Sequence, residues 1–308
     1  MFFAMKVLVT GGSGYIGRYI VKELEENGYD VYILSRRGKG KNVVRGDIRD
    51  AKALVKLMKG YDAVFHNAAL ALDWGRKKEF YETNVRGTEN VAKACIENGI
   101  ERIVYTSSAG IYGFPNSMEV ITEDSPKKPL NAYQKSKWMG EMVLKKYDIK
   151  VSIVRPPLVL GGNGRATRIL VSSIKNGSFS YIGDGNSYIT IVHPADVAKC
   201  LRLALEKDKK GEAFNVASFS CRIKEMVEAI AEKLGVKVEK HVSYYAAYLF
   251  AILSEIFASI SKKEPKITRF RVKSLGTNRI ISFEKAKKKL GYKPSYNLEK
   301  VVEDMLAQ

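Results

Sequence analysis

Short apolar runs alternate with segments of helical periodicity over the first half of this 308-residue chain. The apolar runs predict strands near residues 6–10, 30–35, 62–66, 101–106 and 150–155. The amphipathic segments predict helices near residues 15–26, 50–59, 77–98 and 131–147. Alternating strands and helices are typical of a parallel sheet covered on both faces. The pattern therefore predicts an α/β fold with a doubly wound parallel sheet.

A glycine-rich turn follows the first predicted strand and precedes the first predicted helix. Gly11 permits a sharp turn, Gly14 allows the backbone to approach a phosphate, and Gly17 allows the helix to pack close to the strand. Such a turn presents backbone N–H groups and a helix N-terminus to a pyrophosphate. The fold is therefore predicted to be of the Rossmann type, with dinucleotide contacts from Gly11, Ser13, Gly14, Tyr15, Ile16 and Gly17.

The regular alternation ends near Arg155, where glycine-rich loops begin at Gly161–Gly164. We therefore expect an NAD(P)-binding domain over residues 1–156 and a smaller substrate-binding α/β lobe over residues 157–308. This division leaves room for some strands and helices after residue 156 to pack in the first domain.

The end of the second predicted strand bears on which dinucleotide binds. NAD-binding folds usually place an acidic residue there for the ribose 2′-hydroxyl, whereas this chain reads Ser35, Arg36 and Arg37. Guanidinium groups bind a phosphate by bidentate, charge-assisted hydrogen bonds. The sequence predicts NADP as the cofactor, with NAD as the alternative.

Small and polar residues follow a short apolar strand that ends before Gly46, and also the predicted strand 62–66. Asp47 is predicted to accept a hydrogen bond from the adenine amino group, and Asp50 to cap the helix that follows it. The small residues of the segment Asn67, Ala68 and Ala69 suit a backbone that passes close to the cofactor. His66 is interpreted as a hydrogen-bonded histidine at a strand end, because the three histidines share no metal-binding spacing.

A serine and a Tyr-x-x-x-Lys pair form the candidate catalytic group. Tyr133 and Lys137 lie at i and i+4 and share one face of a predicted helix. A neighbouring ammonium lowers the pKa of a phenol, which makes tyrosine a usable proton donor or acceptor. Ser108, at the end of the predicted strand 101–106, is expected to hold a substrate carbonyl or hydroxyl by a hydrogen bond.

These motifs resemble the extended short-chain dehydrogenase/reductase superfamily, whose fold is of the NAD(P)-dependent epimerase/dehydratase type. The matching segments occur in the family's order: TGGSGYIG (10–17), GDIRD (46–50), HNAA (66–69), NVRGTENV (84–91), YTSSAGIYG (105–113), YQKSK (133–137) and RPPLVLGG (155–162). The resemblance implies that Ser108, Tyr133 and Lys137 are the catalytic residues. It also implies cofactor contacts from Ile48, Asn84, Thr106, Pro156 and Leu158, in addition to Tyr133 and Lys137. For Asn84, a purely structural role is the equal alternative.

Two branches of this superfamily remain in competition. Sugar-nucleotide members usually carry an Asn where this chain has Leu158, and an Arg that meets the diphosphate where it has Ile189. Burying phosphate charge without partners costs several kcal/mol, which counts against such a substrate. The chain instead resembles the 3β-hydroxysteroid dehydrogenase-like branch. Ser108, Leu158 and Ile189 are the predicted substrate contacts, although Leu158 and Ile189 could simply pack.

The predicted function is therefore hydride transfer between a nicotinamide and a hydrophobic secondary alcohol or ketone, steroid- or isoprenoid-like. The alternative is a nucleotide-sugar 4-epimerase or dehydratase with a divergent pocket. The net charge of +19 raises a third possibility, a nucleic-acid-binding or dinucleotide-sensing protein. The presence of all three catalytic residue types argues against that possibility, and nucleic acid is not an expected partner.

The segment 244–260 is strongly apolar and is followed by a basic stretch. It is open to three interpretations: a core helix, a wall of the substrate site, or an interfacial helix on anionic lipid. We expect a cytoplasmic protein with peripheral membrane contact through residues 244–273 as an option. The three scattered cysteines are expected to be reduced. A homodimer is expected through the helices 77–98 and 131–147.

Overall fold

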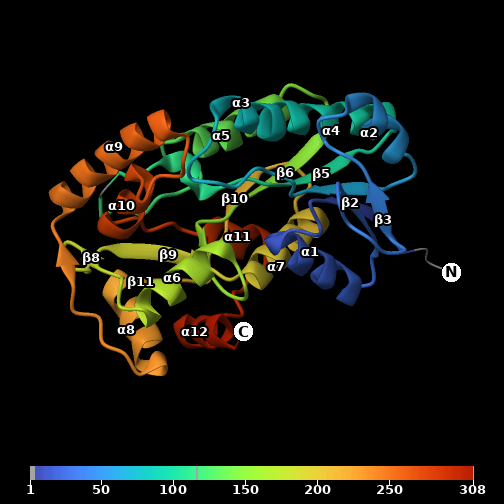
Figure 1. Cartoon of the computed structure of the whole chain (residues 1–308). Helices are drawn as coiled ribbons and strands as arrows, with labels where there is room; N and C mark the ends of the chain where they lie inside the picture. The colour runs from blue at the N-terminus through green and yellow to red at the C-terminus, as the bar shows by residue number, and fades with distance from the viewer. Residues whose placement is uncertain (1–3, 116, 308) are drawn as a thin grey trace.

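Seven parallel strands form the central sheet, in the order β10-β6-β5-β4-β1-β2-β3 (Figure 1). The computed structural model describes residues 4–115 and 117–307. The strands are β1 (Lys6–Thr10), β2 (Asp30–Ser35), β3 (Val43–Arg45), β4 (Ala63–His66), β5 (Arg102–Thr106), β6 (Lys150–Arg155) and β10 (Ala213–Asn215). The strand order reverses between β1 and β4, which opens a crevice at the carboxyl ends of the strands. The predicted Rossmann-type fold is confirmed.

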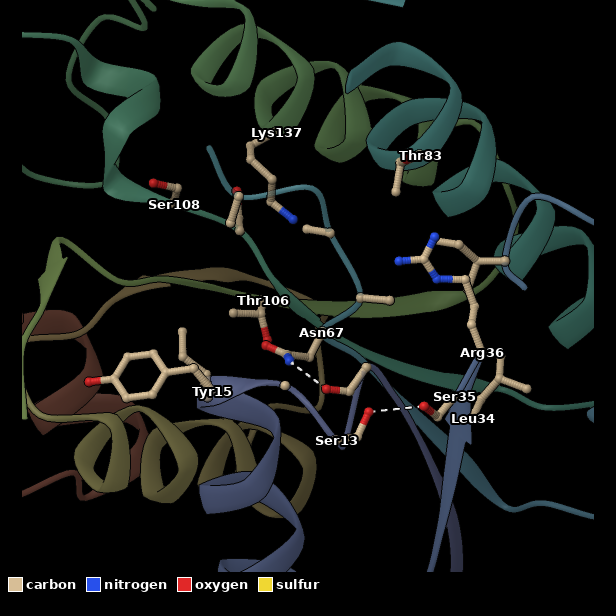
Figure 2. Close-up of a pocket in the computed structure, with 18 of the residues that line it drawn as sticks. Ser13, Tyr15, Leu34, Ser35, Arg36, Asn67, Thr83, Thr106, Ser108 and Lys137 are labelled. Carbon is tan, nitrogen blue, oxygen red and sulfur yellow. Dashed lines mark hydrogen bonds between the residues drawn. The ribbon is translucent and has the colours of Figure 1, made fainter. Parts of the chain in front are cut away.

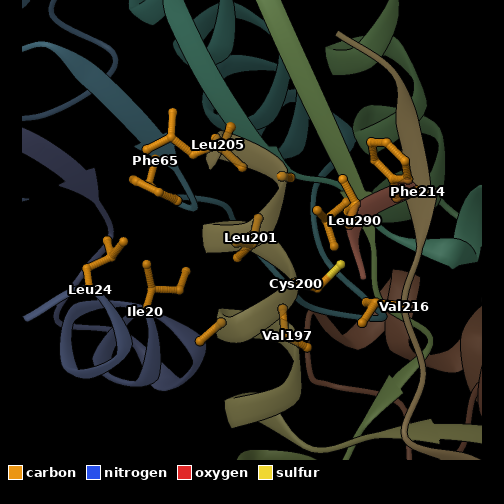
Figure 3. Close-up of a cluster of buried hydrophobic side chains, with 14 of the residues drawn as sticks. Ile20, Leu24, Phe65, Val197, Cys200, Leu201, Leu205, Phe214, Val216 and Leu290 are labelled. Carbon is orange, nitrogen blue, oxygen red and sulfur yellow. The ribbon is translucent and has the colours of Figure 1, made fainter. Parts of the chain in front are cut away.

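Helices cover both faces of this sheet, as its near-continuous apolar strands require. One face carries α1 (Tyr15–Glu26), α7 (Pro194–Lys207) and α11 (Glu284–Leu290), and the other carries α2 (Ala51–Leu57), α4 (Gly87–Glu97) and α5 (Ala132–Leu144). Figure 3 shows the first face, where Ile20 and Leu24 of α1 meet Val197 and Leu201 of α7. Cys200 is buried in the same cluster, and all three cysteines are free thiols.

The predicted helix 77–98 is divided into three parts. A short helix α3 (Lys77–Tyr81) runs into a π-helical turn (Glu82–Arg86), and α4 continues from there. The π-helical turn inserts an extra residue, which the 3.6-residue periodicity of the sequence does not reveal. Such turns occur frequently at functional sites, and Thr83 of this one lines the pocket described below.

The second lobe is built on a three-stranded sheet, β11 (Phe219–Arg222), β9 (Tyr188–Val192) and β7 (Leu158–Val159), and on the pair β8 (Tyr181–Ile182) and β12 (His241–Val242). It also contains α6 (Arg165–Lys175), α8 (Ile223–Leu234), α9 (Tyr244–Ser261), α10 (Arg269–Gly276) and α12 (Leu298–Leu306). Strand β10 and helices α7 and α11 follow residue 156 in the chain but pack in the first layer. The division of the chain at residue 156 stays a prediction.

Helix α9 lies at the margin of the second lobe, with α10 on its inner side (Figure 1). Its buried face consists of Ala247, Ala251, Glu255 and Ala258. The opposite face is apolar and exposed, from Tyr245 at 83% to Ile260 at 78%. By length and composition the helix could cross a membrane. A core helix would be mostly buried within the protein, whereas only 22% of this one is. The interpretation of this segment as a core helix is therefore wrong.

A buried ion pair joins the elements that carry the candidate catalytic residues. Arg155 at the end of β6 lies 2.7 Å from Glu141 of α5, and both side chains are almost fully buried. Glu141 also accepts a hydrogen bond from Ser107, which follows β5, at 2.5 Å. Arg155 donates a further bond to the Tyr112 hydroxyl at 2.7 Å. These bonds tie the ends of β5 and β6 to α5.

We expect Glu141→Leu to lower the free energy of unfolding by about 3–5 kcal/mol, because Arg155 would remain buried without a counter-charge. The double variant Glu141→Leu with Arg155→Leu should recover part of this loss. Urea denaturation measures both. The control Glu82→Leu breaks an exposed pair with Arg86 and should cost no more than about 1 kcal/mol. A Glu141→Leu protein as stable as this control would contradict the proposed role of the ion pair.

Candidate active site

The turn between β1 and α1 has the shape of a phosphate cradle. Gly11 adopts φ +69°, and a Cβ at this position would lie 2.8 Å from the Cα of Ala68. A Cβ at Gly17 would lie 2.1 Å from the carbonyl oxygen of Gly11. Gly14 begins the helix without a side-chain cap. The first N–H groups of α1 are thus left for an outside acceptor, and the residues fit a dinucleotide pyrophosphate.

A pocket of about 510 Å³ extends from this turn along the carboxyl ends of β1, β2, β4 and β5 to α5 (Figure 2). It brings together most of the residues that the sequence singled out. Those that line it are Gly11, Ser13, Gly14, Tyr15, Ile16, Ser35, Arg36, Arg37, Asp47, Ile48, Asn67, Ala68, Ala69, Thr106, Ser108, Tyr133, Lys137 and Pro156.

Four predicted site residues lie outside the pocket lining. Gly17 supports the turn from behind, as its close approach to Gly11 shows. Asn84 is buried and bonds both backbone groups of Leu70, at 2.7 and 3.0 Å, so it has the structural role that the sequence left open. Leu158 and Ile189 pack in the core of the second lobe, where Ile189 is only 4% exposed. For these two residues the structure shows packing and not pocket lining.

Several pocket residues were missed by the sequence analysis. All of them lie within two residues of a predicted residue in the chain: Leu34, Gly46, Arg49, Ala71, Thr83, Ser107, Pro157 and Val159. Thr83 belongs to the π-helical turn and precedes Asn84, which is buried away from the pocket lining. Arg49 holds the Asp47 carboxylate at 2.6 Å. Its hydrogen bond lowers the pKa of Asp47, which stays an acceptor at neutral pH.

The phosphate-binding candidates stand at one end of the pocket. Figure 2 places Arg36 at the end of the pocket away from Ser108. Arg36 and Arg37 are exposed, and within the described part of the chain no hydrogen bond or ion pair holds either guanidinium. The Ser13 and Ser35 hydroxyls are bonded to each other at 2.9 Å. Two cations at the end of β2 are therefore available to bind an anion.

Ser108 and Tyr133 meet at the other end of the pocket. Ser108 caps a 3-10 turn (Ala109–Tyr112), and its Oγ accepts a bond from Gly110 N at 3.0 Å. Helix α5 starts with a capping box formed by Asn131 and Gln134, which fixes Tyr133 in its first turn. Burial raises the pKa of Tyr133, and a hydrogen bond with Ser108 opposes that shift. The phenol is therefore protonated at neutral pH.

Lys137 is a buried residue of α5, one helical turn after Tyr133. Its ammonium is 4.1 Å from the centre of the Tyr105 ring, and its side chain is 1% exposed. Burial lowers the pKa of Lys137 to about 7, a shift that Glu141 partly opposes. Burial, opposed by the hydrogen bond with Ser108, accounts for the raised pKa of Tyr133. That Lys137 lowers this pKa stays a prediction.

His66 is a hydrogen-bonded histidine at a strand end, as predicted. Its two ring nitrogens bond Thr10 at 2.7 Å and Thr88 at 2.9 Å. The ring stacks on Tyr105. Among the described residues there is no group of three or more His, Cys, Asp or Glu side chains that could hold a metal ion. Burial, aided by the charge of Lys137, lowers the pKa of His66 to about 3. The imidazole is neutral and serves to hold the floor of the pocket.

Comparison with known proteins agrees with this geometry. The model of the NAD dependent epimerase/dehydratase family matches residues 7–217. The chain is 30% identical to the 2-alkyl-3-oxoalkanoate reductase of Stenotrophomonas maltophilia, over 96% of each protein. It is 28% identical to the decarboxylating sterol-4-alpha-carboxylate 3-dehydrogenase of Dictyostelium discoideum, over 97% of this chain and 99% of the relative.

Among solved structures, MoeE5 in complex with UDP-glucose and NAD superposes with a TM-score of 0.78. The two are 25% identical, and the match covers 98% of this chain and 97% of MoeE5. These matches agree with the dinucleotide site that the glycine cradle and the pocket beside it indicate. The chain belongs to the NAD dependent epimerase/dehydratase family and is an NAD(P)-dependent oxidoreductase of the extended short-chain dehydrogenase/reductase type.

Proposed function

We propose that Ser108, Tyr133 and Lys137 catalyse hydride transfer between the nicotinamide and a hydrophobic ketone or secondary alcohol. The observation that carries this proposal is that all three side chains line the same pocket as the glycine turn, with Tyr133 hydrogen-bonded to Ser108. The nicotinamide supplies or accepts the hydride when the cofactor is bound.

Each of the three residues has a role that follows from its surroundings. The Ser108 hydroxyl donates a hydrogen bond to the substrate oxygen and orients it. Tyr133 donates its proton to the oxygen as negative charge develops there, and its raised pKa keeps that proton available at neutral pH. Lys137 is within the same pocket and stabilises the phenolate that the transfer leaves behind. Oxidation of an alcohol is the same sequence in reverse.

The substrate class rests on the walls of the pocket and on the relatives. Pro156, Pro157 and Val159 line the pocket. Leu158 and Ile189, which pack in the core of the second lobe, stand where sugar-nucleotide members of the family usually carry an Asn and an Arg. The two enzymes named above act on 2-alkyl-3-oxoalkanoates and sterol carboxylates. These observations support a steroid- or isoprenoid-like substrate.

A nucleotide-sugar epimerase or dehydratase is the second candidate. The solved structure of MoeE5 supports it, because MoeE5 has a similar fold and is in complex with UDP-glucose and NAD. The aliphatic residues at positions 158 and 189 count against it. A rise in melting temperature on addition of UDP-glucose, with no turnover of hydrophobic ketones, would favour this candidate over the first.

Replacing Tyr133 by Phe removes the proton donor and leaves the ring in place. We expect kcat with a hydrophobic ketone to fall by about a thousandfold. Cofactor affinity, measured by fluorescence titration, should stay within a few-fold. The control Tyr147→Phe removes a hydroxyl that bonds Glu89 away from the pocket and should leave kcat unchanged. Near-normal turnover by Tyr133→Phe would exclude the proposed role.

We propose NADP as the preferred cofactor, because Arg36 and Arg37 are exposed at the pocket and Ser35 stands where an acidic residue would select NAD. Arg36→Ala should raise the KM for NADPH at least about tenfold, since a bidentate phosphate contact is lost, and leave the KM for NADH unchanged. Arg45→Ala removes an exposed arginine of β3 outside the pocket and is the control. Equal effects on both cofactors would argue against a 2′-phosphate site.

We further propose that α9 rests on an anionic membrane surface. Its exposed apolar face is formed by Tyr245, Leu249, Phe250, Leu253, Ile256, Phe257 and Ile260. Exposed Lys262, Lys263 and Lys266 follow directly and add electrostatic attraction to acidic lipid. A homodimer through α4 and α5 is proposed separately, because Ile96 and Met142 are exposed on these helices.

Flotation with vesicles of phosphatidylcholine and phosphatidylserine tests the membrane contact. The protein should float with the vesicles at low salt, and Leu253→Gln combined with Phe257→Gln should abolish flotation because the apolar anchor is lost. Ile169→Gln changes an exposed apolar residue of α6 and should float normally. Equal flotation of all three proteins would contradict the assignment.

Sedimentation velocity of the same samples without vesicles tests the dimer. Detection of monomer alone would contradict it.

A further inference from the structure

Arg279 is a buried cation with no partner in the described part of the chain. Its side chain is 8% exposed, and no hydrogen bond or ion pair holds its guanidinium. Burial alone lowers the pKa of Arg279 to about 10, so the group is still charged at neutral pH. Its Cζ lies 5.0 Å from the centre of the Phe114 ring. Arg155, buried to a similar degree, is by contrast fully paired with Glu141.

Burying most of a guanidinium without a counter-charge is unfavourable, because the face of an aromatic ring replaces only part of the lost hydration. We therefore expect the guanidinium to be paired with a negative charge in another state of the protein. Since no carboxylate of the described chain supplies it, an anion from outside would do so. The planar guanidinium matches a carboxylate by two parallel hydrogen bonds.

The backbone fixes Arg279 beside the second lobe's central strand. Its N–H donates to the carbonyl of Tyr188 at 2.8 Å, and Ile189 of β9 is its bridge partner. Ile281, two residues on, lies on the same side of this extended segment and packs with Ile111 and Tyr112. These two residues belong to the turn that Ser108 caps. Arg279 is therefore on a wall that adjoins the candidate catalytic turn.

The cavity that Phe114 lines is apolar and cationic. Phe114 lines a cavity of about 200 Å³ together with Tyr112, Pro115 and Leu130. The two charged residues of this lining are Lys128 and Lys273, and neither forms an ion pair with the described chain. An apolar cavity lined by two lysines, with an unpaired arginine against the ring of Phe114, suits a ligand that has both a hydrocarbon body and a negative charge.

We propose that Arg279 binds a carboxylate of the substrate, which is then a hydrophobic acid that bears the reacting ketone or secondary alcohol. This assignment rests on the proposed function for the reacting end of the molecule. Arg279 acts as a specificity-determining residue: it selects the charged acid over its neutral ester and takes no part in the proton or hydride transfer.

Binding measured in the Tyr133→Phe background separates this proposal from the catalytic one, because no turnover is needed. The probes are 3-hydroxydecanoic acid and its methyl ester, titrated by calorimetry with NADP present. We expect the acid to bind at least about tenfold more tightly than the ester. Arg279→Met should reduce the affinity for the acid to that for the ester and leave the ester unchanged, and Arg279→Lys should retain part of the preference.

Two controls test a purely structural role. Arg222→Met removes an exposed arginine that also lies over an aromatic ring, Tyr188, and should leave both affinities unchanged. The melting temperature of Arg279→Met should equal or exceed that of the parent, since an unpaired buried charge is removed. A lowered melting temperature with equal loss of both ligands would overturn the proposal.

Failure of the acid to bind the Arg279-containing protein, or equal binding of acid and ester, would also overturn it. Inorganic phosphate that binds as tightly as the acid, and depends on Arg279 in the same way, would replace the carboxylate by a phosphate and overturn the assignment. Normal turnover by Tyr133→Phe would instead refute the catalytic proposal and leave the result on Arg279 intact.

Discussion

The ion pair between Arg155 and Glu141 is the interaction on which the arrangement of the candidate site depends. Strands β5 and β6 end at the same edge of the sheet, but neither strand by itself determines where α5 lies above that edge. Glu141 positions α5 by pairing with Arg155 and accepting a hydrogen bond from Ser107, and Arg155 in turn donates a hydrogen bond to Tyr112. Ser108 lies next to Ser107, and Tyr133 lies two helical turns from Glu141. The hydroxyls of Ser108 and Tyr133 meet because their elements are joined beneath them.

Buried cations show how this protein separates stability from function. Arg155 is fully paired, and its removal from the pair is costly. Within the described residues, no carboxylate is bonded to Lys137, which lies over the Tyr105 ring, and burial lowers its pKa to about 7. Arg279 likewise has no ion-pair partner in the described chain and lies over Phe114. Both of these buried cations are near the candidate catalytic turn, which is where bound ligands would supply the missing interactions.

The second lobe combines a closed core with an open face. Its sheet packs against α6, α8 and α12 through a continuous apolar cluster that includes Leu158 and Ile189. Helix α9 instead buries small residues against α10 and leaves its large apolar residues outside. Alanines allow the two helices to approach closely, whereas the exposed face has no partner within the described chain. An exposed apolar surface of this kind is typical of a site of interaction with lipid or with another protein.

How much could be predicted from sequence depended on the range of the interaction. The order and approximate bounds of the strands, the glycine turn, and the pairing of Tyr133 with Lys137 on one helical face follow from local spacing, and the structure contains each of them. The π-helical turn that presents Thr83, the packing of Ile189, the exposure of α9 and the unpaired state of Arg279 depend on contacts between residues far apart in the chain. Periodicity reports which side of an element is apolar, but it does not report what that side meets. Burial of a charge and the shift of its pKa are properties of the assembled molecule, because they are determined by which groups the tertiary structure brings around it.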